Sequence, residues 1–312
     1  MAVTRSLRFT NHVIDKFWRA RVEVAGLTVT FGAAGTAGKS RTVKLRSPAE
    51  AKAEMERLAG ERIKLGYEDE KAREAERRGR EGKADAMGAS VPRLSIVKLK
   101  RVGKPIRKLV SKLGGQPVWV GNAEWPISKR WKTPMRFIGQ VTLEPAVFGK
   151  MKARMAYLFA TAFEWPIAGQ YFETDACFAD KGENAVVIQP GGTRAGFETE
   201  ALEEGPTLYD ERGCPSEFEI VTKRGTDPAF VPERKREEDD DGYFDAVYGD
   251  KIGGTPAFFQ GDQWPRPARA GEWQLLLQLS LGIRREFVLN IPTMLFAFVS
   301  RDGKRGAVLA QH

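Results

Sequence analysis

The sequence predicts a mainly β protein of the α+β class. It indicates a small antiparallel sheet with one packed helix, followed by a larger β-rich domain built from two pseudo-symmetric halves. Three patterns support this: alternating side chains near the N-terminus, one capped helix after them, and a duplicated motif in the remaining chain. The 312 residues fit two domains of about 150 residues each. Hydrophobic residues make up 42%, which is enough to bury a core.

Alternating side chains predict antiparallel strands in the first part of the chain. Apolar and charged residues alternate over 17–24, which is the period of a half-buried strand. After a short turn, residues 27–31 return as its hairpin partner, and residues 41–46 form a third strand. Residues 47–50 (Ser-Pro-Ala-Glu) then predict a helix start, with the serine as N-cap and the glutamate completing a capping box.

The basic character of the chain is concentrated in its first third. The formal net charge is +9, but residues 1–110 hold 26 basic and 13 acidic residues, whereas residues 111–312 hold 24 and 28. Four basic residues lie on the predicted outward face of the first strands: Arg19, Arg21, Lys44 and Arg46. Lys39 is expected beside them in the adjacent loop. Such a patch can neutralise phosphates of a nucleic acid. A solvated sheet face and a protein contact are the alternatives.

The N-terminal segment resembles a WGR domain over roughly residues 5–67. The resemblance depends on the strand-loop-strand run 28–40, the Ser-Pro-x-Glu-Ala helix start and the sequence Lys-Leu-Gly-Tyr at 64–67. The triplet that names the family reads Phe31-Gly32-Ala33 here, so its tryptophan and arginine are replaced. The resemblance implies a sheet-plus-helix module of the kind that contacts DNA in poly(ADP-ribose) polymerases.

A charged segment separates this module from the rest of the chain. We expect three parts: residues 1–67 as the WGR-like domain, 68–92 as a charged linker, and 93–312 as the β-rich domain. Lys98 to Lys108 is a further basic run. It is interpreted either as a solvated lead-in strand or as an extension of the same electrostatic surface.

The larger domain contains an internal duplication. Lys112-Leu-Gly-Gly-Gln-Pro is followed by Trp125-Pro, and Lys251-Ile-Gly-Gly-Thr-Pro is followed at the same spacing by Trp264-Pro. A matching strand with one central glutamine follows each copy, at residues 137–143 and 275–281, and a further apolar strand follows at 155–159 and 294–298. We therefore expect two related half-domains packed face to face around a shared core. The motif residues with expected structural roles are Gly114, Gly115, Trp125, Gln140, Gly253, Gly254, Trp264 and Gln278.

The duplicated region, roughly residues 105–302, resembles the YwqG-like family of unknown biochemical function. The resemblance depends on the two Lys-[Leu/Ile]-Gly-Gly-x-Pro motifs, the Trp-Pro pairs and the glutamine-containing strands. Members occur in bacterial toxin neighbourhoods, which implies an immunity role. No catalytic residues are implied.

Composition argues against several classes of site. The two histidines, His12 and His312, lie near the ends of the chain, and the two cysteines, Cys177 and Cys214, stand alone. We therefore expect no catalytic residues, no metal site and no cofactor. The run Glu237 to Asp241 is expected to be a solvated loop. No segment has the length and apolarity of a membrane span, so we expect a cytoplasmic protein without a membrane partner.

These observations lead to a non-enzymatic binding protein. The main hypothesis is an immunity protein that neutralises a cognate toxin or effector, for example a nuclease, by direct protein–protein binding. The alternative is a DNA- or RNA-binding accessory protein that acts through the WGR-like module.

Overall fold

The computed structural model describes most of the chain, in two compact units, Met1–Lys83 and Ala84–His312. The described residues are 3–10, 15–33, 36–70, 90–165, 169–193, 196–210, 212–236, 241–266, 272–280, 289–290 and 294–311. Among the helices of these residues, none is long and apolar enough to cross a membrane.

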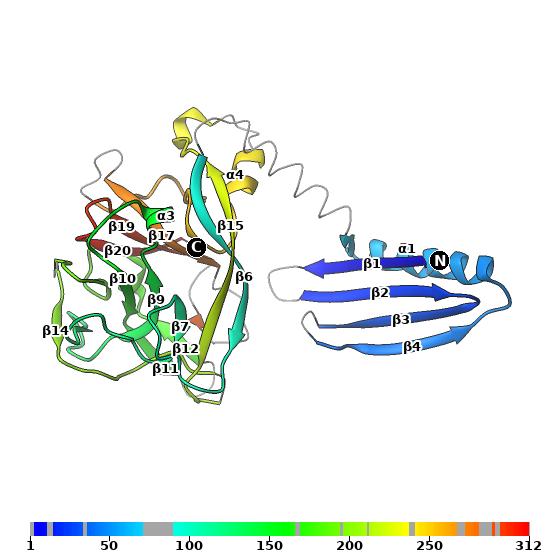
Figure 1. Cartoon of the computed structure of the whole chain (residues 1–312), viewed down its shortest axis with the longest axis horizontal. Coiled ribbons are helices and arrows are strands. Elements are labelled where there is room, and N and C mark those ends of the chain that lie inside the picture. Colours follow the sequence, from blue (N-terminus) through cyan, green and yellow to red (C-terminus); the bar gives the residue numbers. More distant parts are fainter. Residues whose placement is uncertain are drawn as a thin grey trace. The chain divides into compact units, whose positions relative to one another are not determined.

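The first unit is a five-stranded sheet covered on one face by a helix (Figure 1). Its strands are β1 (Val3–Thr10), β2 (Asp15–Glu23), β3 (Gly26–Ala33), β4 (Lys39–Lys44) and β5 (Glu68–Asp69), and they lie in the order β4-β3-β2-β1-β5. The strands β1 to β4 form an antiparallel meander, since each pairs with the next along the chain. The helix α1 (Pro48–Lys64) follows β4.

The alternation on β2 positions the helix. Trp18, Ala20 and Val22 are buried on the face that packs against Ala51 and Met55 of α1. The predicted helix start is confirmed: the Ser47 hydroxyl accepts a hydrogen bond from the Glu50 amide at 3.1 Å. Among the described residues of this unit no helix packs on the opposite face of the sheet, and we call it the helix-free face.

The second unit is built on a ten-stranded antiparallel sheet that is nearly closed (Figure 1). The strand order is β13-β10-β9-β7-β15-β6-β16-β17-β19-β20. The bounds are β6 (Ser90–Arg101), β7 (Lys112–Gly114), β9 (Arg136–Thr142), β10 (Met155–Ala160), β13 (Asn184–Gln189), β15 (Glu217–Pro228), β16 (Lys251–Gly253), β17 (Trp273–Ser280), β19 (Met294–Ser300) and β20 (Gly306–Gln311). The two outer strands approach each other, because Asn184 Nδ2 donates to the Val308 carbonyl at 3.2 Å.

Shorter elements complete this unit. They are β8 (Trp125–Ile127), α3 (Pro145–Phe148), β11 (Ala162–Trp165), β12 (Gly169–Phe172), η1 (Thr174–Cys177), β14 (Glu198–Glu200), η2 (Glu233–Lys235), α4 (Asp241–Val247) and β18 (Leu289–Asn290). β8 pairs with β14, and β12 lies between β11 and β18.

The sheet has an approximate twofold symmetry about the β6–β15 pair. The first half is β15, β7, β9, β10 and β13, and the second is β6, β16, β17, β19 and β20, in matching order. The two halves are joined edge to edge through β6 and β15 in one continuous sheet. They do share one core, in which Leu113 and Ile138 belong to the same cluster as Ile252 and Leu277.

The mainly β fold is confirmed in both units. The segment expected as a linker, 68–92, includes β5 and the first residues of β6. β5 belongs to the first sheet because Glu68 and Asp69 pair with Arg8 and Leu7. Residues 71–89 lie outside the described residues.

Candidate functional site

The helix-free face of the first unit presents two arginines in rows of hydroxyl groups. Arg19 of β2 lies between Ser6 of β1 and Thr30 of β3. The row continues to Ser40 of β4, whose Oγ is hydrogen-bonded to the Thr30 hydroxyl at 2.9 Å. Because paired residues share a face of the sheet, all four side chains point away from α1.

The neighbouring row repeats this arrangement around Arg21. Arg21 lies between Thr4 and Thr28, and Thr42 completes the row on β4. The Thr28 and Thr42 hydroxyls are hydrogen-bonded at 2.9 Å. Cross-strand hydroxyl bonds of this kind hold the polar surface in place without occupying the guanidinium groups.

The charges of the face are mostly cationic. Arg19 is exposed, and its guanidinium lies over the Phe17 ring at 5.2 Å. Arg21 is also exposed and forms an ion pair with Glu23. Lys44, opposite Gly26, is exposed on the same face. Exposed ion pairs are weak, so Arg21 can exchange its partner for a phosphate at little cost.

Two of the predicted patch residues lie outside the rows: Lys39 by its register and Arg46 because it follows the end of β4. Lys39 pairs with Phe31, which itself pairs with Trp18, so its register places it on the helix side of the sheet. Arg46 follows β4 and its amide donates to the Glu50 carboxylate at 2.9 Å, as part of the helix start. The structure therefore brings Arg19, Arg21 and Lys44 together, but not all five basic residues.

The triplet Phe31-Gly32-Ala33 lies at the end of β3, beside a returning loop. A Cβ on Gly32 would lie 2.8 Å from Gly38 Cα, so this position needs glycine for the close approach. Lys39 then begins β4, directly after Gly38, which lies against the Phe17 ring.

The second unit contains a buried lysine in each repeat. Lys112 is 1% exposed, and its ammonium donates to the Glu217 carboxylate at 2.6 Å and to the Ile106 carbonyl at 3.0 Å. Burial lowers the pKa of Lys112, and the bond to Glu217 opposes this shift. The carboxylate also accepts from the Ile106 amide at 3.2 Å, so both members of the ion pair hold the same loop.

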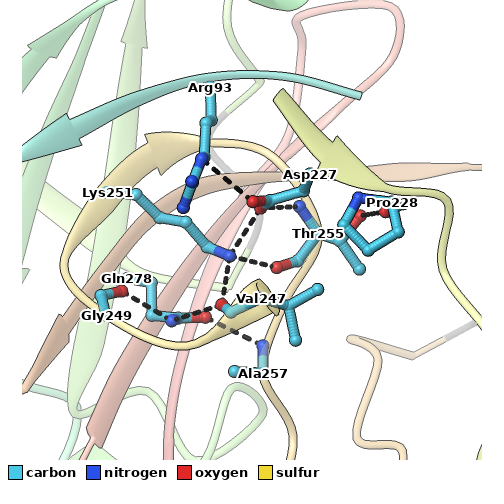
Figure 2. A network of polar contacts seen from close by, with 9 residues as sticks. All are labelled: Arg93, Asp227, Pro228, Val247, Gly249, Lys251, Thr255, Ala257 and Gln278. Atoms are coloured by element: carbon cyan, nitrogen blue, oxygen red, sulfur yellow. Dashed lines mark hydrogen bonds and ion pairs between the residues drawn. The ribbon is translucent and has the colours of Figure 1, made fainter. Parts of the chain in front are cut away.

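Lys251 is the counterpart of Lys112 in the second half, and it is fully buried (Figure 2). Its ammonium donates to Asp227 Oδ2 and to the Thr255 carbonyl, both at 2.6 Å, and to the Val247 carbonyl. Arg93 lies on the other side of the same carboxylate, with Nε 3.0 Å from Asp227 Oδ1. Burial lowers the pKa of Lys251 to about 8, although Asp227 opposes the shift.

Paired glycines make room for these ion pairs. Gly114 and Gly253 have φ of +65° and +71°, and Gly115 and Gly254 have φ of +67° and +81°. A Cβ on Gly115 would lie 2.8 Å from Glu217 Cγ, and one on Gly254 would lie 3.1 Å from Asp227 Cγ. The Gly-Gly motif therefore both turns the chain and admits a carboxylate.

The repeat glutamines bind backbone groups, not each other. Gln140 Oε1 accepts from the Val118 amide at 2.9 Å, and Gln278 Oε1 accepts from the Ala257 amide at 2.9 Å. A second pair, Gln189 and Gln311, lies outside the predicted motif, and their amide groups bind the next residues of the same two loops. A glutamine in such an apolar strand is buried and needs hydrogen-bond partners, which here are backbone groups.

The two tryptophans of the motif close aromatic clusters. Trp125 is fully buried and its Nε1 donates to the Met135 carbonyl at 2.7 Å. Trp264 is half-buried and packs edge-on against Phe230 at 5.1 Å and Phe258 at 5.5 Å. Their contacts are those of a hydrophobic core.

The remaining candidates contribute no site within the described residues. No group of three or more His, Cys, Asp or Glu side chains there could hold a metal ion. Cys177 is buried and Cys214 exposed, and both are free thiols. Of the acidic run 237–241, residues 237–240 lie outside the described residues, as do both histidines.

The first unit is thus a small sheet-and-helix module whose helix-free face carries Arg19, Arg21 and Lys44. Residues 3–74 match the WGR domain family. Among solved structures, the chain is similar to a structural genomics target from Bacteroides fragilis, with 28% identity and a TM-score of 0.21. That similarity covers 22% of this chain and 19% of the other, so the chain spans only a small part of that protein. No curated protein matches the chain.

Proposed function

We propose that this chain is a non-enzymatic nucleic-acid-binding protein and that the helix-free face of its WGR domain is the binding surface. The observation that carries the proposal is the pair of arginine rows, in which Arg19 and Arg21 stand between hydroxyl groups. Arginine guanidinium groups and hydroxyl groups are the side chains that most often contact phosphate and sugar. The alternative hypothesis of the sequence analysis is therefore the one we adopt.

The surface favours the backbone over the bases. Sheet faces that read single-stranded bases present exposed aromatic rings for stacking. The two rows contain arginine, serine and threonine side chains, and Phe17 at their border is buried. The spacing of two residues along β2 separates the arginines by about 7 Å, so they can contact separate phosphates. Binding of this kind tolerates sequence and weakens steeply with salt.

The family match supports the same assignment. WGR domains are often associated with nucleic-acid binding, and residues 3–74 match that family. Because Ala33 stands in place of the arginine of the naming triplet, we assign the phosphate contacts to Arg19 and Arg21 on β2 instead.

A matched pair of variants tests the face. Arg19→Ala/Arg21→Ala removes two charges from the helix-free face, and Lys39→Ala/Arg41→Ala removes two from the helix side. We expect the first variant to weaken binding to a duplex DNA at least tenfold at low salt. It should also reduce the slope of log K against log salt by about two. Equal losses in both variants, or none in the first, would overturn the proposal.

We assign no function to the second unit as a whole. The duplicated motif and the twofold sheet support the resemblance of residues 105–302 to the YwqG-like family. The immunity role, with a cognate toxin as partner, stays a prediction that none of the matched proteins supports.

A further inference from the structure

The second unit has a basic surface of its own, on the long ribbon formed by β6 and β15. The two strands pair over their full length, from Phe218 opposite Arg101 to Pro228 opposite Ser90. One face of the ribbon packs Leu94 and Phe218 into the core. The other face is the one that carries Glu219, and we call it the outer face.

Alternation assigns the charged residues to this outer face. Lys100 lies opposite Glu219, Lys98 opposite Val221, and Lys223 opposite Ser95. All three lysines are exposed. Lys100 forms an ion pair with Glu219 at 3.4 Å, while Lys98 and Lys223 form none within the described part of the chain. Val97 and Val221 are exposed apolar residues on the same two strands.

The loop after β6 extends the same surface. It returns over the end of the outer face, because the Ile106 amide donates to Glu217, which lies two residues before Glu219 on β15. The buried Lys112 holds the Ile106 carbonyl and so fixes the loop there. Its exposed charged side chains are all basic: Lys104, Arg107 and Lys108.

This surface is more basic than the unit to which it belongs. Residues 84–312 contain 31 basic and 29 acidic residues and are nearly neutral. We define the ribbon surface as Lys98, Lys100, Lys104, Arg107, Lys108 and Lys223. These six cations lie beside the exposed acid Glu219, whereas Glu217 on the same face is buried against Lys112. Such a local excess attracts polyanions even on a neutral domain.

We propose that the ribbon surface is a second nucleic-acid contact, which binds the phosphate backbone independently of the helix-free face. Unpaired lysines on rigid strands are suited to phosphate as point charges, and their position on paired strands limits the entropy lost on binding. The surface holds no aromatic ring for base stacking among its defining residues, so the contact is independent of sequence. An acidic protein surface would need apolar anchors, and the exposed apolar residues near the ribbon surface are aliphatic types that seldom act as such anchors: Val97, Leu109, Val110 and Val221.

A triple substitution in the full-length protein tests this contact. Lys98→Gln/Arg107→Gln/Lys223→Gln removes three cations of the ribbon surface, and Lys150→Gln/Lys152→Gln/Lys181→Gln removes three exposed lysines from other loops of the same unit. The probe is a duplex DNA of about 30 base pairs, measured by fluorescence anisotropy over a salt series. We expect the magnitude of the slope of log K against log salt to fall by about three in the ribbon variant and to stay unchanged in the control.

Combination with Arg19→Ala/Arg21→Ala separates the two proposals. If both surfaces bind, each set alone weakens binding and the combined variant loses it. A ribbon variant that binds like its control at every salt concentration would overturn the second contact and leave the proposed function intact. Loss in the ribbon variant alone would overturn the helix-free face and retain the ribbon surface. Melting curves of all variants establish that they are folded.

Discussion

Arg93 of β6 occupies, in the second half of the large sheet, the position that Glu217 of β15 occupies in the first. Gly114 pairs with Glu217, and its repeat counterpart Gly253 pairs with Arg93. The two residues have opposite charge, although each lies beside an equivalent buried lysine. The second half therefore takes its counter-charge from Asp227, at the far end of β15.

This exchange changes the balance of charge at the two sites. Lys112 and Glu217 form a neutral pair, whereas Lys251 and Arg93 share the single carboxylate of Asp227, whose side chain is fully buried. A buried charge without a partner is strongly unfavourable. Removing the Asp227 carboxylate leaves two cations without their common partner, so it should cost more stability than removing the Glu217 carboxylate, which has one.

We expect Asp227→Asn to destabilise the second unit by about 3–5 kcal/mol, because two buried or half-buried cations would lose their common partner. The double variant Arg93→Glu/Asp227→Asn places a carboxylate where the first half has Glu217. It should recover a large part of the loss in urea unfolding. If the double variant is as unstable as Asp227→Asn alone, the two positions are not interchangeable.

Lys251 should make stability depend on pH in the alkaline range. Its pKa is lowered by burial from 10.5 to about 8. Between these two values the unfolded chain binds the proton more tightly than the folded one, so the free energy of unfolding rises with pH. Below about pH 8 both states are protonated and the contribution is flat. Unfolding curves from pH 7 to 10.5 measure this rise.

Lys251→Met is the control for that titration. The variant should be less stable than the wild type at every pH, because the Val247 and Thr255 carbonyls lose their donor. Its unfolding free energy should lack the rise between pH 8 and 10.5. A rise of the same size in both proteins would assign the titration to another group.

The sequence predicted most of the local structure but not the pairing of charges. Alternation placed Arg19, Arg21 and Lys44 on one face because a strand repeats every two residues. Lys39 was expected in the loop before a strand at 41–46, whereas β4 begins at Lys39 opposite Phe31, a register that depends on pairing between strands. Glu217 and Asp227 were missed because they lie on β15, outside the repeated motif, and reach their lysines only across the folded sheet.

The second glutamine pair was hidden by insertions of different length. The repeat places most equivalent residues 139 positions apart, as with Lys112 and Lys251, but Gln189 and Gln311 are 122 apart. The first half contains β11, β12 and η1 between β10 and β13, whereas β19 and β20 are joined by a short turn. A fixed spacing cannot reveal residues that lie beyond such an insertion.

Glycine substitutions should separate backbone strain from steric blockage. Gly114→Ala places a methyl group 3.1 Å from the Ser216 carbonyl carbon at φ +65°, in a closely packed turn. Gly191 has φ +84° but open space around it. We expect Gly191→Ala to cost about 1–2 kcal/mol from the left-handed conformation alone, and Gly114→Ala to cost clearly more. Equal melting temperatures of the two variants would argue against close packing at Gly114.

The symmetry of the glutamine contacts gives a final prediction. Gln140→Leu frees the Val118 amide and the Val110 carbonyl, and Gln278→Leu frees the Ala257 amide and the Gly249 carbonyl. Each buried group left without a partner costs about 1–3 kcal/mol. The two variants should therefore lose similar stability, even though they lie in opposite halves.

The double variant Gln140→Leu/Gln278→Leu tests whether the halves unfold together. Both glutamines hold loops on a single sheet that shares one core, so denaturant should unfold the second unit in one transition. Losses should then add, because the two sites have no shared partner. Two separate transitions in the double variant would show that each half is a cooperative unit of its own, in spite of the continuous β6–β15 pairing.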